Sequence, residues 1–140
     1  MKITFLKFKF FFGSKVLKKK LKNQSNRMVQ SCNVEDATSM GMICVIKNMN
    51  DYESVVQILN LIKGEFKIPH IKILAYYPNK DDPDFLKSRL GLDFFTIYDL
   101  NYYALPKKAV VKNFISERFD ILLDLTEIET IPLRLILLLS

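Results

Sequence analysis

Three carboxylates, Asp124, Glu127 and Glu129, follow one another near the end of a short apolar run. If that run is a strand of an open parallel sheet, these acids lie just beyond its carboxyl end, where such sheets bind their ligands. Carboxylates grouped in this way hold a metal ion or act as general acid and base. No histidine or basic residue accompanies them, so we prefer the plainer interpretation that they cap a helix and solvate a loop.

A dense group of aromatic residues precedes Lys107 and Lys108. Aromatic rings beside lysines stack on exposed bases of nucleic acids, but aromatic rings beside short strands more often supply core area. We therefore predict that this group packs in the core, and we keep base stacking as the alternative. The group consists of Phe94, Phe95, Tyr98, Tyr102 and Tyr103.

The remaining residues suited to chemistry are few. His70 follows Pro69 at the entrance of a predicted strand, where a surface or hydrogen-bonded histidine is expected. Cys32 and Cys44 form no C-x-x-C pair, so neither a zinc site nor a disulfide is indicated, and a reducing cytoplasm fits. No dinucleotide fingerprint, Walker motif or G-x-S-x-G elbow is present. We expect no cofactor and no bound metal, and we favour a non-enzymatic protein.

Charge is distributed unevenly along the chain. Residues 1–30 hold nine of the 21 lysines and arginines and no acid, whereas the remaining residues hold 12 cations and all 15 acids. A basic arm thus precedes a body with a balance of three negative charges. Such arms bind nucleic acid or anionic lipid because phosphate attracts lysine strongly. The candidate anion-binding residues are Lys15, Lys18, Lys19, Lys20, Lys22 and Arg27.

The N-terminus also contains aromatic residues that a membrane surface would bury, namely Phe5, Phe8 and Phe12. Lys7 and Lys9 interrupt the apolar run, so a secretory signal is not indicated. No stretch of roughly 18 uncharged apolar residues is present to span a bilayer. A peripheral membrane protein remains an alternative.

The elements that would position these residues are predicted from apolar spacing. Short apolar runs predict buried strands at Gly41–Ile46, Ile71–Tyr77, Leu92–Ile97 and Phe119–Leu125. Apolar residues at helical spacing predict a helix from Asp51 to about Lys63, with Asn50 and Glu53 as a capping box. A strand, helix, strand order favours parallel pairing.

The end of the chain is predicted to add helices to this sheet. Residues Ala109–Ile115 are helical or extended, and a last helix opens near Thr130 with Pro132 in its first turn. We expect residues 1–39 to form a basic helical arm and linker. Residues 40–140 then form a three-layer α/β domain with an open, mainly parallel sheet, like half of a Rossmann or flavodoxin fold.

The segment from Asp93 to Ser140 resembles a domain of unknown function found in small Bacteroidetes proteins. The matching motifs are Asp93–Thr96 with Asp99–Asn101, Asn113–Ile115 with Phe119–Leu125, and Pro132–Arg134 with Leu139 and Ser140. The resemblance implies a bacterial cytoplasmic protein of undefined activity, whose relatives continue past the position of Ser140. On that basis we expect a chain truncated at its C-terminus.

A shorter likeness joins Phe119–Leu125 to a core strand of bacterial heptosyltransferases, which are glycosyltransferases with Rossmann-like halves. It supports an α/β strand and supplies no catalytic site. We therefore expect a non-enzymatic domain that its arm docks on RNA or the ribosome. The alternatives are the peripheral membrane protein, and a small enzyme or vestigial glycosyltransferase-like domain that uses the carboxylates near Asp124.

Overall fold

The computed structural model describes residues 32–127 and 130–140 of the 140-residue chain. The predicted helical arm lies outside these residues. All four predicted strands and both later helices are present within a few residues of the predicted positions. In chain order the elements are β1 (Ser39–Val45), α2 (Met49–Glu65), β2 (His70–Tyr77), β3 (Leu92–Thr96), the 3-10 helix η1 (Ile97–Asp99), α3 (Ala109–Ser116), β4 (Ile121–Asp124) and α4 (Ile131–Leu139).

The four strands form one sheet in the order β3-β2-β1-β4, and every pair is parallel. β1 lies in the middle, with Gly41 opposite Lys72 of β2 on one side and opposite Leu122 of β4 on the other. The predicted parallel pairing is confirmed. The chain leaves β1 toward β2 and β3, then returns to the other side of β1, which is the order of the first four strands of a Rossmann sheet.

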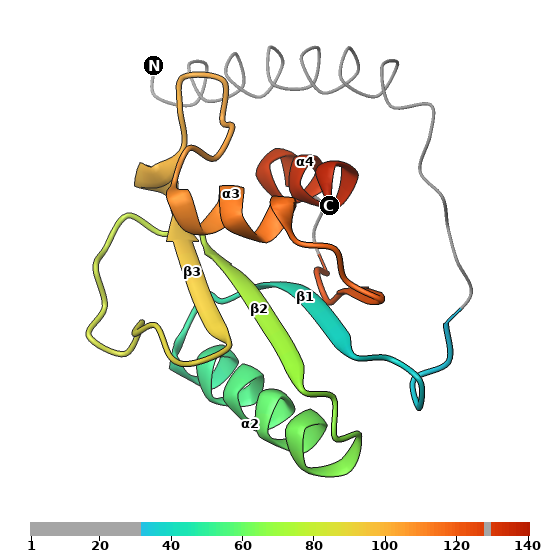
Figure 1. Cartoon of the computed structure of the whole chain (residues 1–140). Helices are drawn as coiled ribbons and strands as arrows, with labels where there is room; N and C mark the ends of the chain where they lie inside the picture. Colours follow the sequence, from blue (N-terminus) through green and yellow to red (C-terminus); the bar gives the residue numbers. More distant parts are fainter. Residues whose placement is uncertain (1–31, 128–129) are drawn as a thin grey trace.

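Helices cover both faces of this sheet (Figure 1). α2 packs on one face, and α3 and α4 pack on the other, so the domain has the predicted three layers. Alternate residues of β1 serve the two layers, because Met42 and Cys44 pack with α2 whereas Ile43 packs with α3 and α4. Burial on both faces explains why the strands appear in the sequence as continuous apolar runs.

The start of α2 corrects one prediction. The helix begins at Met49, and its N-cap is Asn48, whose side chain accepts a 3.0 Å hydrogen bond from the backbone N–H of Asp51. Asn50 is already the second helical residue, so the predicted capping box of Asn50 and Glu53 is wrong. Asn48 takes the cap because its backbone is extended, as a cap residue requires.

The later elements follow the predictions with smaller adjustments. The segment Ala109–Ile115, predicted to be helical or extended, forms the helix α3. β4 is shorter than the predicted run and only partly buried, because it has a paired neighbour on one side alone among the described strands. α4 begins after Thr130 with Pro132 in its first turn, as predicted, and buries Leu133 and Ile136.

A close approach fixes the distance between β1 and the segment that enters β4. A Cβ atom built on Gly41 would lie 2.6 Å from the ring of Phe119, so only glycine leaves room for this ring. Phe119 in turn packs on Phe114 of α3, with ring centroids 4.9 Å apart, and stacks with His70 of β2 at 6.4 Å. One aromatic side chain thus joins three elements at the amino ends of the strands.

The two cysteines lie in different surroundings. Cys32 is exposed, whereas Cys44 is buried in the central strand. Burial is the main cause that raises the pKa of the Cys44 thiol to about 12, and the negative charge of Asp51 adds to it. The thiol therefore stays protonated and unreactive at neutral pH.

No helix within residues 32–127 and 130–140 has the length and apolar character needed to cross a bilayer.

Candidate functional site

The carboxyl edge of the sheet is the place where an open parallel sheet binds ligands, at the point where the strand order reverses. That point lies between β1 and β4. Asp124 ends β4 there, opposite Ile43 of β1. Its Oδ1 accepts hydrogen bonds from the backbone N–H of Thr126 at 2.9 Å and from the Thr126 hydroxyl at 2.6 Å. The Asp124 carboxylate therefore closes the turn that follows its own strand.

The other predicted acids do not add a described contact to Asp124. Glu127 is exposed, and Glu129 lies outside the described residues. Within the described parts of the chain, no three His, Cys, Asp or Glu side chains are grouped as metal ligands. The grouping of three carboxylates into one site stays a prediction.

The loop after β1 lies at the same edge and is held by one polar group of α2 and one from the segment after β2. The Asp51 carboxylate accepts a 2.9 Å hydrogen bond from the backbone N–H of Lys47, and Asn79 donates a 3.1 Å bond to the Lys47 carbonyl. A free helix N-terminus attracts anions. Here α2 carries Asp51 in its first turn, so the chain supplies its own negative charge at the place that a phosphate would occupy.

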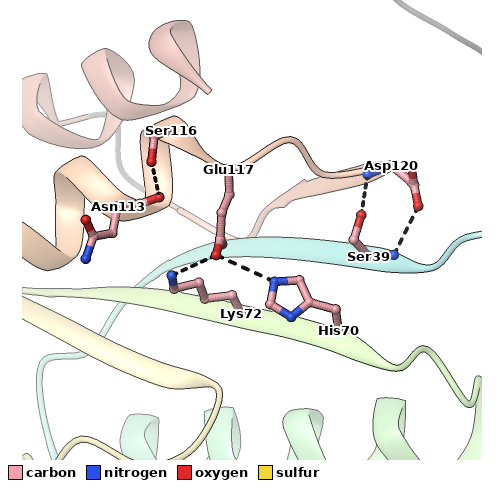
Figure 2. A network of polar contacts seen from close by, with 7 residues as sticks. All are labelled: Ser39, His70, Lys72, Asn113, Ser116, Glu117 and Asp120. Atoms are coloured by element: carbon pink, nitrogen blue, oxygen red, sulfur yellow. Dashed lines mark hydrogen bonds and ion pairs between the residues drawn. The ribbon is translucent and has the colours of Figure 1, made fainter.

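A second polar cluster lies at the opposite, amino edge of the sheet (Figure 2). Glu117, which follows α3, reaches across to β2, where its Oε1 lies 3.2 Å from Lys72 Nζ and 3.7 Å from His70 Nε2. Lys72 has only 18% of its side chain exposed. The other Glu117 oxygen, Oε2, is buried without a hydrogen-bond partner. Glu117 thus balances a half-buried lysine and fastens the end of α3 to the sheet.

Asp120 makes a similar connection to β1. Its Oδ2 accepts bonds from the Thr38 backbone N–H and hydroxyl, both at 2.8 Å, and from the Ser39 backbone N–H at 3.0 Å. In return, the Asp120 backbone N–H donates to the Ser39 hydroxyl at 3.0 Å. The backbone bond from Thr38, then the other bonds from Thr38 and Ser39, lower the pKa of Asp120.

Ser39, His70 and Glu117 are residue types that serve together in hydrolases, but their contacts here point to a structural role. The Ser39 hydroxyl accepts from Asp120, whereas His70 contacts Glu117, so the described structure joins no serine to a histidine base. The sequence prediction of a surface or hydrogen-bonded His70 agrees with this position. The contacts of Glu117 and Asp120 were not predicted, because no short spacing joins residues that are 45 and 82 positions apart.

The aromatic group before Lys107 divides between the core and the surface. Phe95 is completely buried, and Phe94 is packed against the core, as predicted. The core prediction is wrong for the three tyrosines: Tyr98, Tyr102 and Tyr103 are 64%, 47% and 43% exposed. Tyr98 lies in the short helix η1, which has no buried residue, and Tyr102 and Tyr103 lie in the loop between η1 and α3.

This loop, residues 98–106, is here named the tyrosine hairpin. Figure 1 shows it extending from the sheet between β3 and α3. Leu100 pairs antiparallel with Pro106, and the Asn101 side chain accepts bonds from the backbone N–H groups of Tyr103 and Leu105 at 2.9 and 3.1 Å. Ala104, buried under the hairpin, has a φ of 60°. The hairpin is therefore a defined turn, closed by backbone bonds that its own asparagine directs.

Lysines follow the hairpin directly. Lys108 Nζ lies 4.8 Å from the centre of the Phe94 ring and 3.5 Å from Asp99, so it holds the base of the hairpin to β3. Lys107 and Lys112 are exposed. Lys107 and Lys108 directly precede the first residue of α3, where the helix dipole disfavours positive charge and no acid stands in the first turn, and Lys112 is the fourth helical residue.

The predicted anion-binding residues, Lys15, Lys18, Lys19, Lys20, Lys22 and Arg27, all lie outside the described residues. Their role stays a prediction.

Comparison with known proteins places the chain in one family. The pattern of a family of unknown function, DUF6913, matches residues 9–140. The chain belongs to DUF6913. This agrees with the predicted domain of unknown function, and the restriction of its members to Bacteroidetes stays a prediction. No curated protein and no solved structure matches the chain significantly.

Membership of DUF6913 shows which residues the family pattern covers, but it assigns no activity. The match begins at residue 9, so it includes most of the basic N-terminal segment together with every described strand and helix. Residues 9–30 of the basic segment thus lie within the matched region, together with the α/β body. The charges and surfaces of the DUF6913 chain itself therefore support the function proposed below.

Proposed function

We propose that this protein is a non-catalytic binding domain. Its basic N-terminal segment, residues 1–30, attaches the domain to RNA, either free or in the ribosome. One observation carries the proposal. Residues 1–30 contain nine cations and no acid, whereas the rest of the chain contains 12 cations and 15 acids. A net negative body is repelled by nucleic acid, so attachment depends on the segment that bears the opposite charge.

The described body supports a binding role in preference to a catalytic one. At the carboxyl edge the polar groups after β1 and β4 are engaged in closing their own loops, and at the amino edge they connect elements to one another. Both arrangements stabilise the fold. Peripheral binding to lipid and catalysis by the carboxylates near Asp124 are the competing functions, and the experiment below distinguishes the first from RNA binding.

The test is co-sedimentation of the full chain with ribosomes and with anionic phospholipid vesicles at low and high salt. We expect ribosome binding that weakens steeply with salt, because each lysine contact with phosphate releases counterions. Changing Lys18, Lys19, Lys20 and Lys22 to Gln reduces the log–log salt slope by about 2.8 if all four contact single-stranded RNA, at about 0.7 per contact.

The control removes the same charge from the body. Changing Lys47, Lys63, Lys67 and Lys87 to Gln, all of them exposed, leaves the salt slope unchanged. Binding to vesicles that survives high salt would instead indicate insertion of Phe5, Phe8 and Phe12, and would favour the peripheral membrane function. A chain that binds neither ribosomes nor vesicles at low salt would refute the docking proposal.

A further inference from the structure

The six tyrosines of the chain fall into two groups of three. Tyr52, Tyr76 and Tyr77 are buried in the core. The other three are exposed within six residues of one loop. Single exposed apolar residues are ordinary, but several large aromatic side chains gathered on one protruding loop indicate a contact surface.

The tip of the tyrosine hairpin holds two adjacent rings. Tyr102 and Tyr103 have ring centroids 5.4 Å apart at an interplanar angle of 89°, so they present faces in two directions. The Asn101 side chain and the pairing of Leu100 with Pro106 fix the backbone beneath them. A surface that is already ordered loses less conformational entropy when it binds a partner.

The charge around the hairpin indicates the chemistry of that partner. Between Asp99 and Glu117 the chain carries Lys107, Lys108 and Lys112 and no acid. Asp99 is itself 3.5 Å from Lys108 and accepts a bond from the backbone of Thr96, so its charge is offset. Because Lys107 and Lys108 oppose the dipole at the start of α3, helix stability does not explain these two lysines.

Exposed rings beside exposed cations suit a ligand that has both flat apolar faces and negative charge. Unpaired bases stack on aromatic side chains, and the phosphates between them contact lysines. Paired bases already stack on one another, so a duplex offers no free base face to the tyrosine rings. We propose that Tyr102 and Tyr103, with Lys107 and Lys112, contact the bases and backbone of single-stranded RNA. This inference rests on the proposed RNA-binding function and names the part of the body that takes part in it.

Tyr98 is left outside the contact. Its hydroxyl donates to the carbonyl of Lys80, which directly precedes Asp81 and Asp82 in the chain. Those acids repel phosphate. A Tyr98→Leu change therefore has a smaller effect on RNA binding than the same change at Tyr102 or Tyr103.

The test measures binding of the full chain to a fluorescent single-stranded oligoadenylate of about 12 nucleotides, within the roughly 4–16 nucleotides that one single-strand-binding module covers. The double variant Tyr102→Leu, Tyr103→Leu removes the aromatic rings and keeps apolar side chains. We expect its Kd to rise about fivefold or more for each base that loses its stacking partner, with an unchanged salt slope. The variant Lys107→Gln, Lys112→Gln instead makes the slope shallower by about 0.7 per lost contact.

Phe66→Leu is the matched control, because Phe66 is 48% exposed at the end of α2, on the other face of the sheet. It should bind RNA as the unchanged chain does. Circular dichroism checks that each variant is folded, and upfield shifts of the Tyr102 and Tyr103 ring protons on adding RNA report stacking directly.

Four results would overturn the inference. Equal RNA affinity of the double tyrosine variant and the unchanged chain would do so while leaving the proposed function intact. Binding to duplex RNA as tight as to the single strand would do the same. If the hairpin variant lost a ribosome contact that persists after ribonuclease treatment, the hairpin would bind protein. Failure of the unchanged chain to bind any RNA would refute the proposed function as well.

Discussion

The two edges of the sheet use their polar side chains differently. At the amino edge, Glu117 and Asp120 bond to residues 45 and 82 positions away and so hold α3, β4, β1 and β2 together. At the carboxyl edge, Asp124, Asp51 and Asn101 bond within four residues of their own positions. The amino edge is therefore part of the framework of the domain. Longer bonds at the carboxyl edge, from Asn79 to the Lys47 carbonyl and from Tyr98 to the Lys80 carbonyl, join one loop to another. One of these loops presents aromatic rings outward.

The largest expected effect tests the packing at the amino edge. Gly41→Ala places a methyl group 2.6 Å from the Phe119 ring, which cannot stay in contact with Phe114 and His70. We expect a loss of about 1–3 kcal/mol in the free energy of unfolding, as for other overpacked sites. Denaturant unfolding measures it.

Gly64→Ala is the matched control for this change. Gly64 lies in α2 with nothing within 4 Å of an added Cβ, so alanine should stabilise the helix by about 0.5–1 kcal/mol. Opposite signs for the two glycines would support the packing described at the amino edge. A neutral Gly41→Ala would mean that Phe119 moves freely, and the edge would then be less rigid than we infer.

A smaller effect compares one ion pair from each edge. Lys72 and Glu117 are 18% and 33% exposed at 3.2 Å, whereas Lys108 and Asp99 are 36% and 25% exposed at 3.5 Å. In double-mutant cycles with Lys→Met and Glu→Gln or Asp→Asn, we expect about 1 kcal/mol of coupling for the first pair and about 0.5 kcal/mol for the second. Equal couplings, or a stronger pair at the carboxyl edge, would contradict the comparison.

The smallest expected effect is on the acid dependence of stability, and it concerns the aspartates near the two ends of β4. Hydrogen bonds from Thr38 and Ser39 lower the Asp120 pKa below its ordinary value of 3.8. The stabilisation is fully present above that value and is lost as the pH falls through the lower folded-state pKa. Asp120→Asn should therefore reduce the loss of stability that accompanies acidification below about pH 4.

Asp124→Asn is the control, because the Asp124 carboxylate bonds only to Thr126 among the described residues. Urea unfolding between pH 2 and pH 7, with pH values chosen to bracket the aspartate pKa range, compares the two variants with the unchanged chain. If Asp124→Asn flattened the acid dependence as much as Asp120→Asn, the assignment of the framework role to the amino edge would be wrong.

The sequence predicted the framework better than the surfaces. β1 and β2 are recognisable because both faces are buried, which makes their sequences continuously apolar. The cap of α2 was misplaced by two residues, because Asn50 and Glu53 match the capping pattern but Asn48 has the extended backbone. The tyrosines were misassigned because their rings suit a core and a surface equally well, and only the tertiary fold decides between them.

The contacts of Glu117 and Asp120 were beyond the reach of the sequence for a different reason. Each follows α3 within a few residues and looks like an ordinary solvated acid. Asp120 reaches Ser39 only when β4 pairs with β1, and Glu117 reaches Lys72 only when the end of α3 lies beside β2. No local pattern encodes either arrangement.

The burial of Cys44 makes its alkylation rate a measure of local opening in the folded domain. A thiol with a pKa of about 12 offers almost no thiolate to an alkylating reagent at neutral pH, and the central strand also blocks the reagent. Cys32 is exposed to the reagent. After Cys32 has reacted, the remaining rate of alkylation reports how often the sheet opens around β1, and a second added mass marks each molecule in which Cys44 has reacted.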